Sequence, residues 1–487
     1  MGILSAEFFA LVVGTMVLFH AFNPVWWRKS VLACASMIFV MSYAGNGLHP
    51  VWTIPGAVSL LPLVAFALVG FAAIKVAGSV PSWLLVLAVI AVYALVRYFP
   101  PLLEGTDLFV AVGASYILFR ILHLILDKSQ NALTVDLRLR DYLAYLFFFP
   151  TFLAGPIWRY EEYLGSWDTP VKSAHSGEKI FTAFSRIANG CLKILVVTWI
   201  CGIFHEVFFE SSVLAAADTL ASALYFSLAA ILYLLIFYFD FSGYMDIVVG
   251  IGGLFGLTLP ENFNAPFQSA DIIDFWNRWH ITLSKWMQQY LFMPLVTWLS
   301  RRFLGIVKIQ YLGAIGYLAV FLVVGVWHGV SLRYVCFGCI VGFAASATKL
   351  WDSWLIKLVF PGKTEKAVKM HIMYRKFMNA LALFIVASAL VPLWISPEVM
   401  ALFDISFVAC GLMAGMLGAA ALSVLDRFLR EAISLLDRPG RLMAGKKWPA
   451  VFASLGSELW LASRCVAIFG ILAVQNSDMP AFLYQGF

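Results

Sequence analysis

Charged side chains are what this sequence has least of. Only 12% of its 487 residues are Asp, Glu, Lys or Arg, about half of the share in ordinary soluble domains. Apolar residues make up 62% of the chain, and no polar stretch between them is long enough to form a soluble domain. This composition excludes a soluble globular protein and indicates a chain that lies almost wholly in a membrane.

Several catalytic motifs are also missing. The glycines near residue 250 lack the G-x-G-x-x-G spacing of a dinucleotide-binding loop, because Phe255 stands where a glycine is required. His205 and Glu206 have no second histidine to complete a zinc-binding H-E-x-x-H motif. No G-x-S-x-G elbow, Ser/His/Asp spacing or phosphate-binding loop is found. The sequence therefore does not favour a dinucleotide-dependent enzyme, a serine hydrolase or a kinase.

Cysteine is scarce and lies in or beside apolar segments. Cys336 and Cys339 form a close pair, but no second pair accompanies it, and a metal site needs more ligands. We therefore interpret the seven cysteines as small apolar packing residues and expect no metal site.

Apolar runs of the length that a spanning helix needs, roughly 20 residues, recur along the chain. We predict an all-α polytopic membrane protein with about 11–13 transmembrane helices plus re-entrant or interfacial helices. The predicted spans are 4–26, 31–48, 54–75, 81–100, 107–126, 187–209, 217–239, 309–330, 335–356, 377–398, 402–425 and 453–475. Shorter apolar pieces at 142–157, 243–259 and 281–300 are predicted to be re-entrant, interfacial or tilted.

The net charge of +6 is a topology signal, and we expect no nucleic-acid partner. Basic residues gather in short loops such as 301–308 and 349–376, which the positive-inside rule places in the cytoplasm. The same rule puts both termini outside. The first run, 4–26, lacks a basic segment before it, so we expect it to remain as a span rather than to be removed as a signal peptide. His328 then lies toward the outer end of its helix.

We interpret residues 1–487 as a single membrane domain with three regions. Residues 1–130 are plain hydrophobic spans, and residues 346–487 are spans joined by basic loops. Residues 135–345 hold nearly every polar or aromatic cluster, including a proline-broken segment that ends at Arg159 and a run interrupted by Asp240 and Tyr244. The central region is therefore where a functional site is expected.

Two histidines of this region, His280 and His328, lie inside strongly apolar sequence, each beside tryptophan. Ionisable groups at membrane depth are costly and mark functional sites by default, and imidazole is the side chain best suited to moving a proton near neutral pH. Asp274 and Arg278, four residues apart, favour a helix over 271–290. Four residues share one face of such a helix: Trp276, His280, Ser284 and Met287. The pair of histidines indicates a membrane enzyme.

Both histidines also have plainer interpretations. The tryptophans and charges of 271–290 fit an interfacial helix at headgroup level. His328 fits a residue that hydrogen-bonds to a neighbouring helix, or one that lies on a proton path. The residues alone therefore predict only a polytopic membrane protein with a buried polar site.

Four blocks make the chain resemble the bacterial membrane-bound O-acyltransferase family. They are FFFPTFLAGPIWRYEEY, YFDFSGYMDIVVGIGGLFGLTLPENFNAPF, DFWNRWHITLSKWMQQYLFMPL and VWHG, and together they cover roughly residues 140–335. The resemblance is strongest to the branch that contains alginate and cellulose O-acetylation membrane proteins and the teichoic-acid D-alanyl transfer protein.

The resemblance implies a fold and a site. The expected fold is a ring of helices around a thinned centre, with a central tunnel that joins the two membrane faces. His328 is expected to be the catalytic base and His280 a second catalytic residue that orients the reacting groups. The residues expected to bind substrate are Trp276, Asn277, Trp279, Ser284, Trp327, Asp240, Tyr244, Asn262 and Arg159.

The resemblance also implies the substrates and the location. We expect no bound cofactor, and an acyl thioester, with acetyl-coenzyme A foremost, as the donor reached from the cytoplasm. The expected acceptor is an exported polysaccharide or a periplasmic protein that acetylates it, in the bacterial cytoplasmic (inner) membrane. The D-alanyl branch uses a carrier protein as donor, for which the basic loops 128–140 and 349–376 are candidate docking sites.

Two other classes of protein stay open at this point. A transporter or channel would use the histidines to relay protons, but it predicts inverted repeats, and the sequence shows none. A non-catalytic scaffold of an export complex would need neither histidine.

Overall fold

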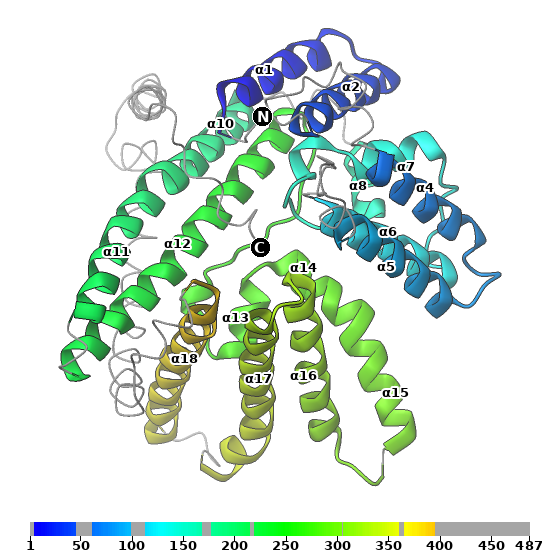
Figure 1. Cartoon of the computed structure of the whole chain (residues 1–487). Helices are drawn as coiled ribbons and strands as arrows, with labels where there is room; N and C mark the ends of the chain where they lie inside the picture. Colours follow the sequence, from blue (N-terminus) through cyan, green and yellow to red (C-terminus); the bar gives the residue numbers. More distant parts are fainter. Residues whose placement is uncertain are drawn as a thin grey trace. The chain divides into compact units, whose positions relative to one another are not determined.

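The computed structural model describes residues 4–44, 61–98, 113–167, 177–214, 219–303, 305–359 and 365–394. These residues form helices joined by turns and short loops, and within them the β-type pairings are two isolated bridges rather than strands (Figure 1). The prediction of an all-α protein is confirmed. The chain divides into two compact units, 1–189 with 244–260 and 190–243 with 261–487, and each is described by itself.

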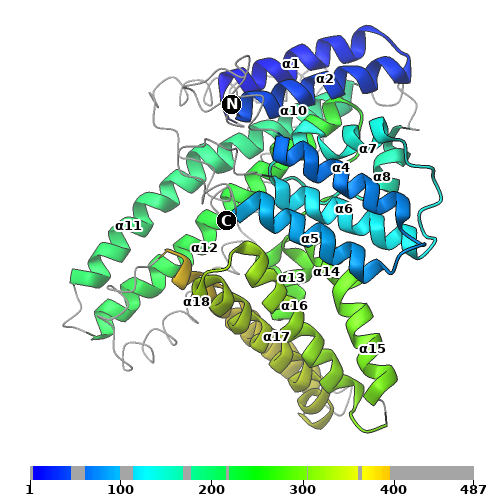
Figure 2. The same ribbon diagram turned by 45° about the vertical axis from the view of Figure 1, so that its right-hand side comes forward.

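The first unit contains the N-terminal helices, and Figure 2 shows α4, α5 and α6 side by side within it. Its elements are α1 (Ala6–Ala21), α2 (Val25–Ala44), α4 (Leu61–Val76), α5 (Ser82–Tyr98), α6 (Ala114–Ser129), α7 (Leu139–Leu146), the 3-10 turn η2 (Phe149–Thr151), α8 (Tyr160–Trp167) and most of α10 (Gly177–Leu192). The end of α12 (Thr219–Leu254) also belongs to this unit.

The second unit contains the C-terminal helices, in which α16 packs on α17 and α17 on α18 (Figure 1). Its elements are the π-helical turn η3 (Lys193–Thr198), α11 (Trp199–Leu214), most of α12, the 3-10 turn η4 (Pro266–Gln268), α13 (Ile272–Arg278), α14 (Ile281–Met287), the π-helical turn η5 (Gln288–Phe292), α15 (Met293–Phe303), α16 (Ile309–His328), α17 (Leu332–Val359) and α18 (Glu365–Trp394).

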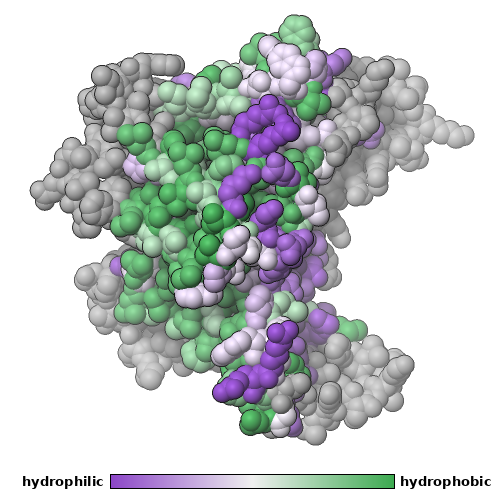
Figure 3. Space-filling model, turned by 90° about the vertical axis from the view of Figure 1, so that its right-hand side faces the viewer, coloured by the Kyte–Doolittle hydropathy of each residue, from purple (hydrophilic) through white to green (hydrophobic). Residues whose placement is uncertain are grey.

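Five helical runs among the described residues are long and apolar enough to cross a membrane. They are Glu178–Val213, Leu220–Leu254, Ile309–His328, Leu332–Asp352 and Ile372–Val391, and three shorter apolar helices accompany them. In Figure 3 most of the coloured side chains that can be seen are apolar, and hydrophilic ones are fewer. These features fit a polytopic membrane protein. The predicted spans 402–425 and 453–475 lie outside the described residues, so the total number of spans stays a prediction.

One prediction about helix boundaries is wrong. The segment 243–259 is not a separate short element, because α12 continues without a break to Leu254 and is 36 residues long. No proline interrupts the run, and the Asp246 carboxylate is satisfied by the Arg186 guanidinium at 3.1 Å. The helix ends at Leu254, and Gly256, with a φ of 72°, closes the turn that follows, in which the Leu257 amide donates to the Gly252 carbonyl at 2.9 Å.

The proline-containing segment 142–157 is broken into short pieces, as predicted. It forms most of α7, then η2 and irregular backbone, and residues 148–157 are buried. Arg120 of α6 is 1% exposed, and its guanidinium donates to the carbonyls of Tyr145, Leu146 and Thr151 at 2.9–3.1 Å. These donors replace the hydrogen bonds that the end of α7 and the irregular backbone after it cannot make internally.

Close contact between glycines joins α16 to α17. A Cβ at Gly338 would lie 2.5 Å from the Phe321 carbonyl oxygen and 3.3 Å from the Gly325 Cα. A Cβ at Gly325 would in turn lie 2.4 Å from the Tyr334 carbonyl oxygen. Only glycine lets the two backbones approach this closely, and this contact is next to the end of α16, where His328 lies.

We expect Gly338→Ala to destabilise the second unit. Because the new methyl group would meet backbone rather than a movable side chain, the helices must separate, at a cost of about 1–3 kcal/mol in the free energy of unfolding. Thermal unfolding of the detergent-solubilised protein measures the change. Gly202→Ala on α11 is the control, since its Cβ would meet nothing within 4 Å; equal melting temperatures for the two variants would contradict the prediction.

Candidate functional site

Both predicted catalytic histidines line one cavity of the second unit. The cavity has a volume of about 110 Å³ and is surrounded by α12, α13, α14, η5, α16, α17 and α18. Most of its walls are apolar or aromatic side chains, such as Phe237, Phe321 and Leu390. A mostly apolar pocket with a few convergent polar groups is the usual form of a small-molecule site.

His328 is the last residue of α16 and is only partly buried. Its ring centroid lies 4.5 Å from that of Trp327 and 6.3 Å from that of Tyr334, whose plane is inclined by 21°. Gly329 follows at once, and a Cβ there would lie 2.3 Å from the Tyr334 ring. Glycine at 329 therefore lets the tyrosine cover the end of the helix beside the imidazole.

His280 lies at a break between two helices. α13 ends at Arg278 and α14 begins at Ile281, and His280 between them has φ 43° and ψ 53°. Its side chain is almost fully buried, and its ring meets that of Phe241 edge-on at 4.9 Å. A left-handed backbone is unfavourable for a residue with a Cβ and is typical of functional sites.

The prediction of one helix over 271–290 is therefore wrong, because a helix cannot continue through a residue at positive φ. The ion pair that supported it is present, with Asp274 Oδ1 and Arg278 Nε 3.0 Å apart. The four residues expected on one helical face nevertheless all line the cavity: Trp276, His280, Ser284 and Met287.

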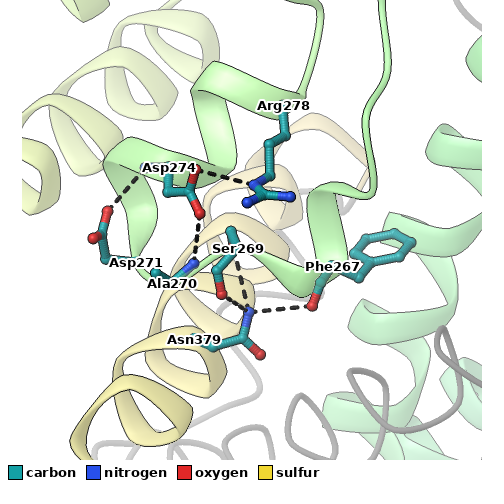
Figure 4. A network of polar contacts seen from close by, with 7 residues as sticks. All are labelled: Phe267, Ser269, Ala270, Asp271, Asp274, Arg278 and Asn379. Atoms are coloured by element: carbon teal, nitrogen blue, oxygen red, sulfur yellow. Dashed lines mark hydrogen bonds and ion pairs between the residues drawn. The ribbon is translucent and has the colours of Figure 1, made fainter. Parts of the chain in front are cut away.

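The first turn of α13 is held by a network of hydrogen bonds (Figure 4). The Asp271 carboxylate accepts from the Asp274 amide at 2.9 Å, and the Asp274 carboxylate accepts from the Ala270 amide at 2.8 Å. The Asn379 side chain of α18 donates to the carbonyls of Phe267 and Ser269. This reciprocal cap and the tie to α18 fix the helix that carries Trp276 and Asn277.

Burial lowers the pKa of His280 to about 3, and the neighbouring His328 acts in the same direction. The imidazole of His280 is therefore neutral near pH 7, with one nitrogen able to donate and the other able to accept a hydrogen bond.

Four of the residues expected to bind substrate line the cavity: Trp276, Asn277, Trp279 and Ser284. The indole N–H of Trp276 is buried and no described residue accepts a hydrogen bond from it. Buried donors are rarely left unsatisfied, so this N–H is a candidate donor to a ligand. The Ser284 hydroxyl, in contrast, donates to the Trp276 carbonyl at 2.8 Å.

The other five expected residues are not among those that line the cavity. Trp327 packs against the His328 ring. Asp240 and Asn262 belong to the same unit and are buried. Tyr244 and Arg159 belong to the first unit, where the Tyr244 hydroxyl accepts from the Ala154 amide at 3.0 Å.

Sequence reasoning missed several polar residues of the cavity, including Tyr317, Gln288 and Tyr334. Helical periodicity offers a signal for the first, because Tyr317, Phe321, Val324 and His328 follow one face of α16. The residues that α18 contributes carry no comparable signal, since they are ordinary apolar positions of a span.

Comparisons with known proteins identify relatives of this chain. The model of the MBOAT, membrane-bound O-acyltransferase family, matches residues 52–396. The teichoic acid D-alanyltransferase of Bacillus subtilis is 30% identical over 243 residues, 50% of this chain and 60% of that protein. The peptidoglycan O-acetyltransferase of Helicobacter pylori is 31% identical over 212 residues, 44% of this chain and 38% of that protein.

A third relative is the "Probable alginate O-acetylase AlgI" of Pseudomonas aeruginosa, 29% identical over 241 residues, 48% of this chain and 41% of that protein. The matched region thus spans less than two thirds of the length of each of these three relatives. The family model, however, extends over most of this chain and includes every residue of the cavity. The protein therefore belongs to the membrane-bound O-acyltransferase family.

Proposed function

We propose that the protein is a membrane O-acyltransferase that moves an acyl group from a cytoplasmic thioester to an acceptor on the outer side of the membrane. The acceptor is the hydroxyl of an exported polysaccharide, or a periplasmic protein that acetylates it, and the donor is acetyl-coenzyme A. The observation that carries the proposal is the joint position of His280 and His328 in one largely apolar cavity, within the region matched by the family.

His328 acts as the general base. Its imidazole takes the proton of the acceptor hydroxyl while the hydroxyl oxygen attacks the thioester carbonyl carbon. The C–O bond forms, the C–S bond breaks, and the thiolate leaves with the bonding electron pair before it is protonated. A thioester already has a good leaving group, so one base and correct positioning suffice. The partial exposure of His328 fits a group that meets an incoming acceptor.

His280 acts as a neutral partner that orients the reacting groups. A neutral imidazole still carries one N–H, which can donate a hydrogen bond to the carbonyl oxygen on which negative charge develops. Trp276 also lines the cavity, and its buried N–H, which has no acceptor among the described residues, is a second candidate donor to that oxygen.

The length of α16 and the basic residues before it support a site that faces the outer side of the cytoplasmic membrane. α16 has 20 residues and so is about 30 Å long, enough to cross the hydrocarbon core. Arg301, Arg302 and Lys308 precede its first turn, and the positive-inside rule places them in the cytoplasm. His328 at the other end then lies toward the outer face. Both termini are proposed to lie outside.

A second candidate function is D-alanyl transfer from a carrier protein to teichoic acid. The match covers 60% of the teichoic acid D-alanyltransferase of Bacillus subtilis. It covers smaller shares of the peptidoglycan O-acetyltransferase and of the "Probable alginate O-acetylase AlgI", and this difference favours the second candidate. The cavity chemistry is the same, because D-alanyl and acetyl thioesters differ only in the acyl group.

Mild alkali treatment of cell envelopes and exported polymers distinguishes the candidates. We expect deletion of the gene to remove ester-bound acetate, and the wild-type gene on a plasmid to restore it. If D-alanine release is instead lost on deletion and restored by the plasmid, the second candidate is favoured. If neither ester changes on deletion, the proposed function is wrong.

A further inference from the structure

Residues 262–264 run antiparallel to residues 278–282 and bond to them on both sides of His280. The Asn264 amide donates to the Arg278 carbonyl at 2.9 Å, and the Ile281 amide donates to the Asn262 carbonyl at 3.0 Å. Between these bonds Phe263 and Trp279 form an antiparallel bridge, with their rings edge-on at 5.1 Å. The backbone around His280 is therefore held by a second strand-like segment.

The side chain of Asn262 adds two bonds to this pairing. It is 1% exposed, and its Oδ1 accepts from the Thr282 amide at 2.9 Å and from the Thr282 hydroxyl at 2.7 Å. Thr282 is in the first turn of α14, whose amides have no partner within the helix. A residue at the N-cap position usually satisfies one of them with its own side chain.

His280 occupies that N-cap position, but its side chain makes no capping bond. Asn262, from a different part of the chain, supplies the missing acceptor. The His280 ring is thereby available to line the cavity. The left-handed backbone of His280 also needs surrounding contacts to hold it, because such a conformation persists only where the structure determines it strongly.

We propose that Asn262 is a positioning residue, which caps α14 in place of His280 and holds the His280 backbone in the left-handed conformation that directs its imidazole to the cavity. This assigns Asn262 a role through His280 instead of the direct contact with substrate expected from the sequence. The consequence for catalysis rests on the proposed function, whereas the structural part does not.

The structural part is tested without any activity. Diethyl pyrocarbonate labels accessible neutral histidines, and peptide mass spectrometry of the full chain in detergent gives the labelling rate of each one. We expect Asn262→Ala to label His280 roughly tenfold faster than wild type, because loss of the two bonds favours local opening. Labelling of His328 in the same sample is the internal reference.

Two matched variants sharpen this test. Asn264→Ala removes the same side chain two residues away, where it is exposed, and should leave the His280 rate within about twofold of wild type. Asn262→Asp keeps an acceptor oxygen that suits a helix N-terminus and should restore protection. Equal labelling of His280 in Asn262→Ala and Asn264→Ala would overturn the proposal.

The kinetic part uses a double-mutant cycle. We expect Asn262→Ala to lower kcat roughly 10- to 100-fold with little change in KM, because it misplaces an orienting group. In a His280→Ala background the same substitution should lower kcat by less than about twofold. An equal loss of kcat in both backgrounds would show that Asn262 does not act through His280.

If Asn262→Ala does not accumulate in folded form, Thr282→Val and Thr282→Ser provide a second test. The valine variant removes only the 2.7 Å bond and should raise His280 labelling, whereas the serine variant keeps a hydroxyl and should not. Equal labelling of His280 in the two variants would count against the proposal. A wild-type protein that transfers no acyl group would refute the proposed function, while protection of His280 would still decide the structural part.

Discussion

Replacement of His328 by alanine is expected to abolish measurable acyl transfer, with a fall of about 10³-fold in kcat. General-base catalysis by a positioned side chain contributes roughly 10²–10⁴-fold, and no other described histidine besides His280 lines the cavity. His280 is neutral but almost fully buried, so it is poorly placed to replace His328 at an incoming hydroxyl. The measurement is thioester-dependent acyl transfer by the purified protein, or ester-bound acetate on exported polymers.

The matched control is His205→Ala. His205 lies on α11 in the same unit, is also partly buried, and does not line the cavity. We expect this variant to retain activity and both variants to reach wild-type amounts in the membrane. Normal acyl transfer by purified His328→Ala would refute the mechanism, whereas normal acetylation of exported polymers in cells that carry this variant would also leave a non-catalytic scaffold open.

Replacement of Arg120 by methionine is expected to destabilise the first unit by about 3 kcal/mol or more in the free energy of unfolding. The substitution keeps much of the side-chain volume but leaves three buried carbonyls without their donors, each at a cost of about 1–3 kcal/mol. The guanidinium of Arg120 also donates to the Thr151 hydroxyl at 2.6 Å. Lysine should restore stability only in part, because one ammonium cannot reproduce the planar fork.

The thermal unfolding midpoint in detergent, followed by the loss of monodisperse protein, measures this effect. Arg140→Met is the control, since the Arg140 side chain is 78% exposed and its ion pair with Asp141 spans 3.8 Å. Exposed pairs contribute about 0–1 kcal/mol, so this variant should melt near wild type. A comparable loss for Arg140→Met, or none for Arg120→Met, would contradict the assignment of Arg120 as the residue that satisfies this backbone.

Helix existence follows from the sequence more reliably than helix continuity does. The predicted spans 309–330 and 335–356 locate both ends of α16 and α17 to within a few residues, and 377–398 locates the end of α18 but not its start. The runs are informative because lipid requires every backbone group to be bonded inside a helix. Polar residues in α12 suggested a break near residue 243, yet the helix continues there. Whether such residues find partners, as Asp246 does with Arg186, depends on neighbours that a linear pattern does not show.

Some residues of the site can also be identified from the sequence, and others cannot. His280 and His328 were identifiable because ionisable residues are rare in apolar sequence and costly there. The residues from α18 that close the cavity were not identifiable, since apolar positions facing a ligand and apolar positions facing lipid have the same composition. The family resemblance named Asn262 as a residue that binds substrate, but its contact with Thr282 joins residues 20 positions apart, which only the fold brings together.

The sequence by itself determined that the chain is helical and membrane-embedded, and that two histidines stand out. These properties follow from composition and local spacing, because transfer free energies of side chains are nearly independent of the fold. The family resemblance implied that the two histidines belong to one site. The tertiary structure alone decided which residues enclose their cavity, that His280 adopts a left-handed backbone, and that Arg120 and Asn262 satisfy backbone groups elsewhere. Those properties depend on contacts between residues far apart in the chain, whose geometry is set only when the helices pack.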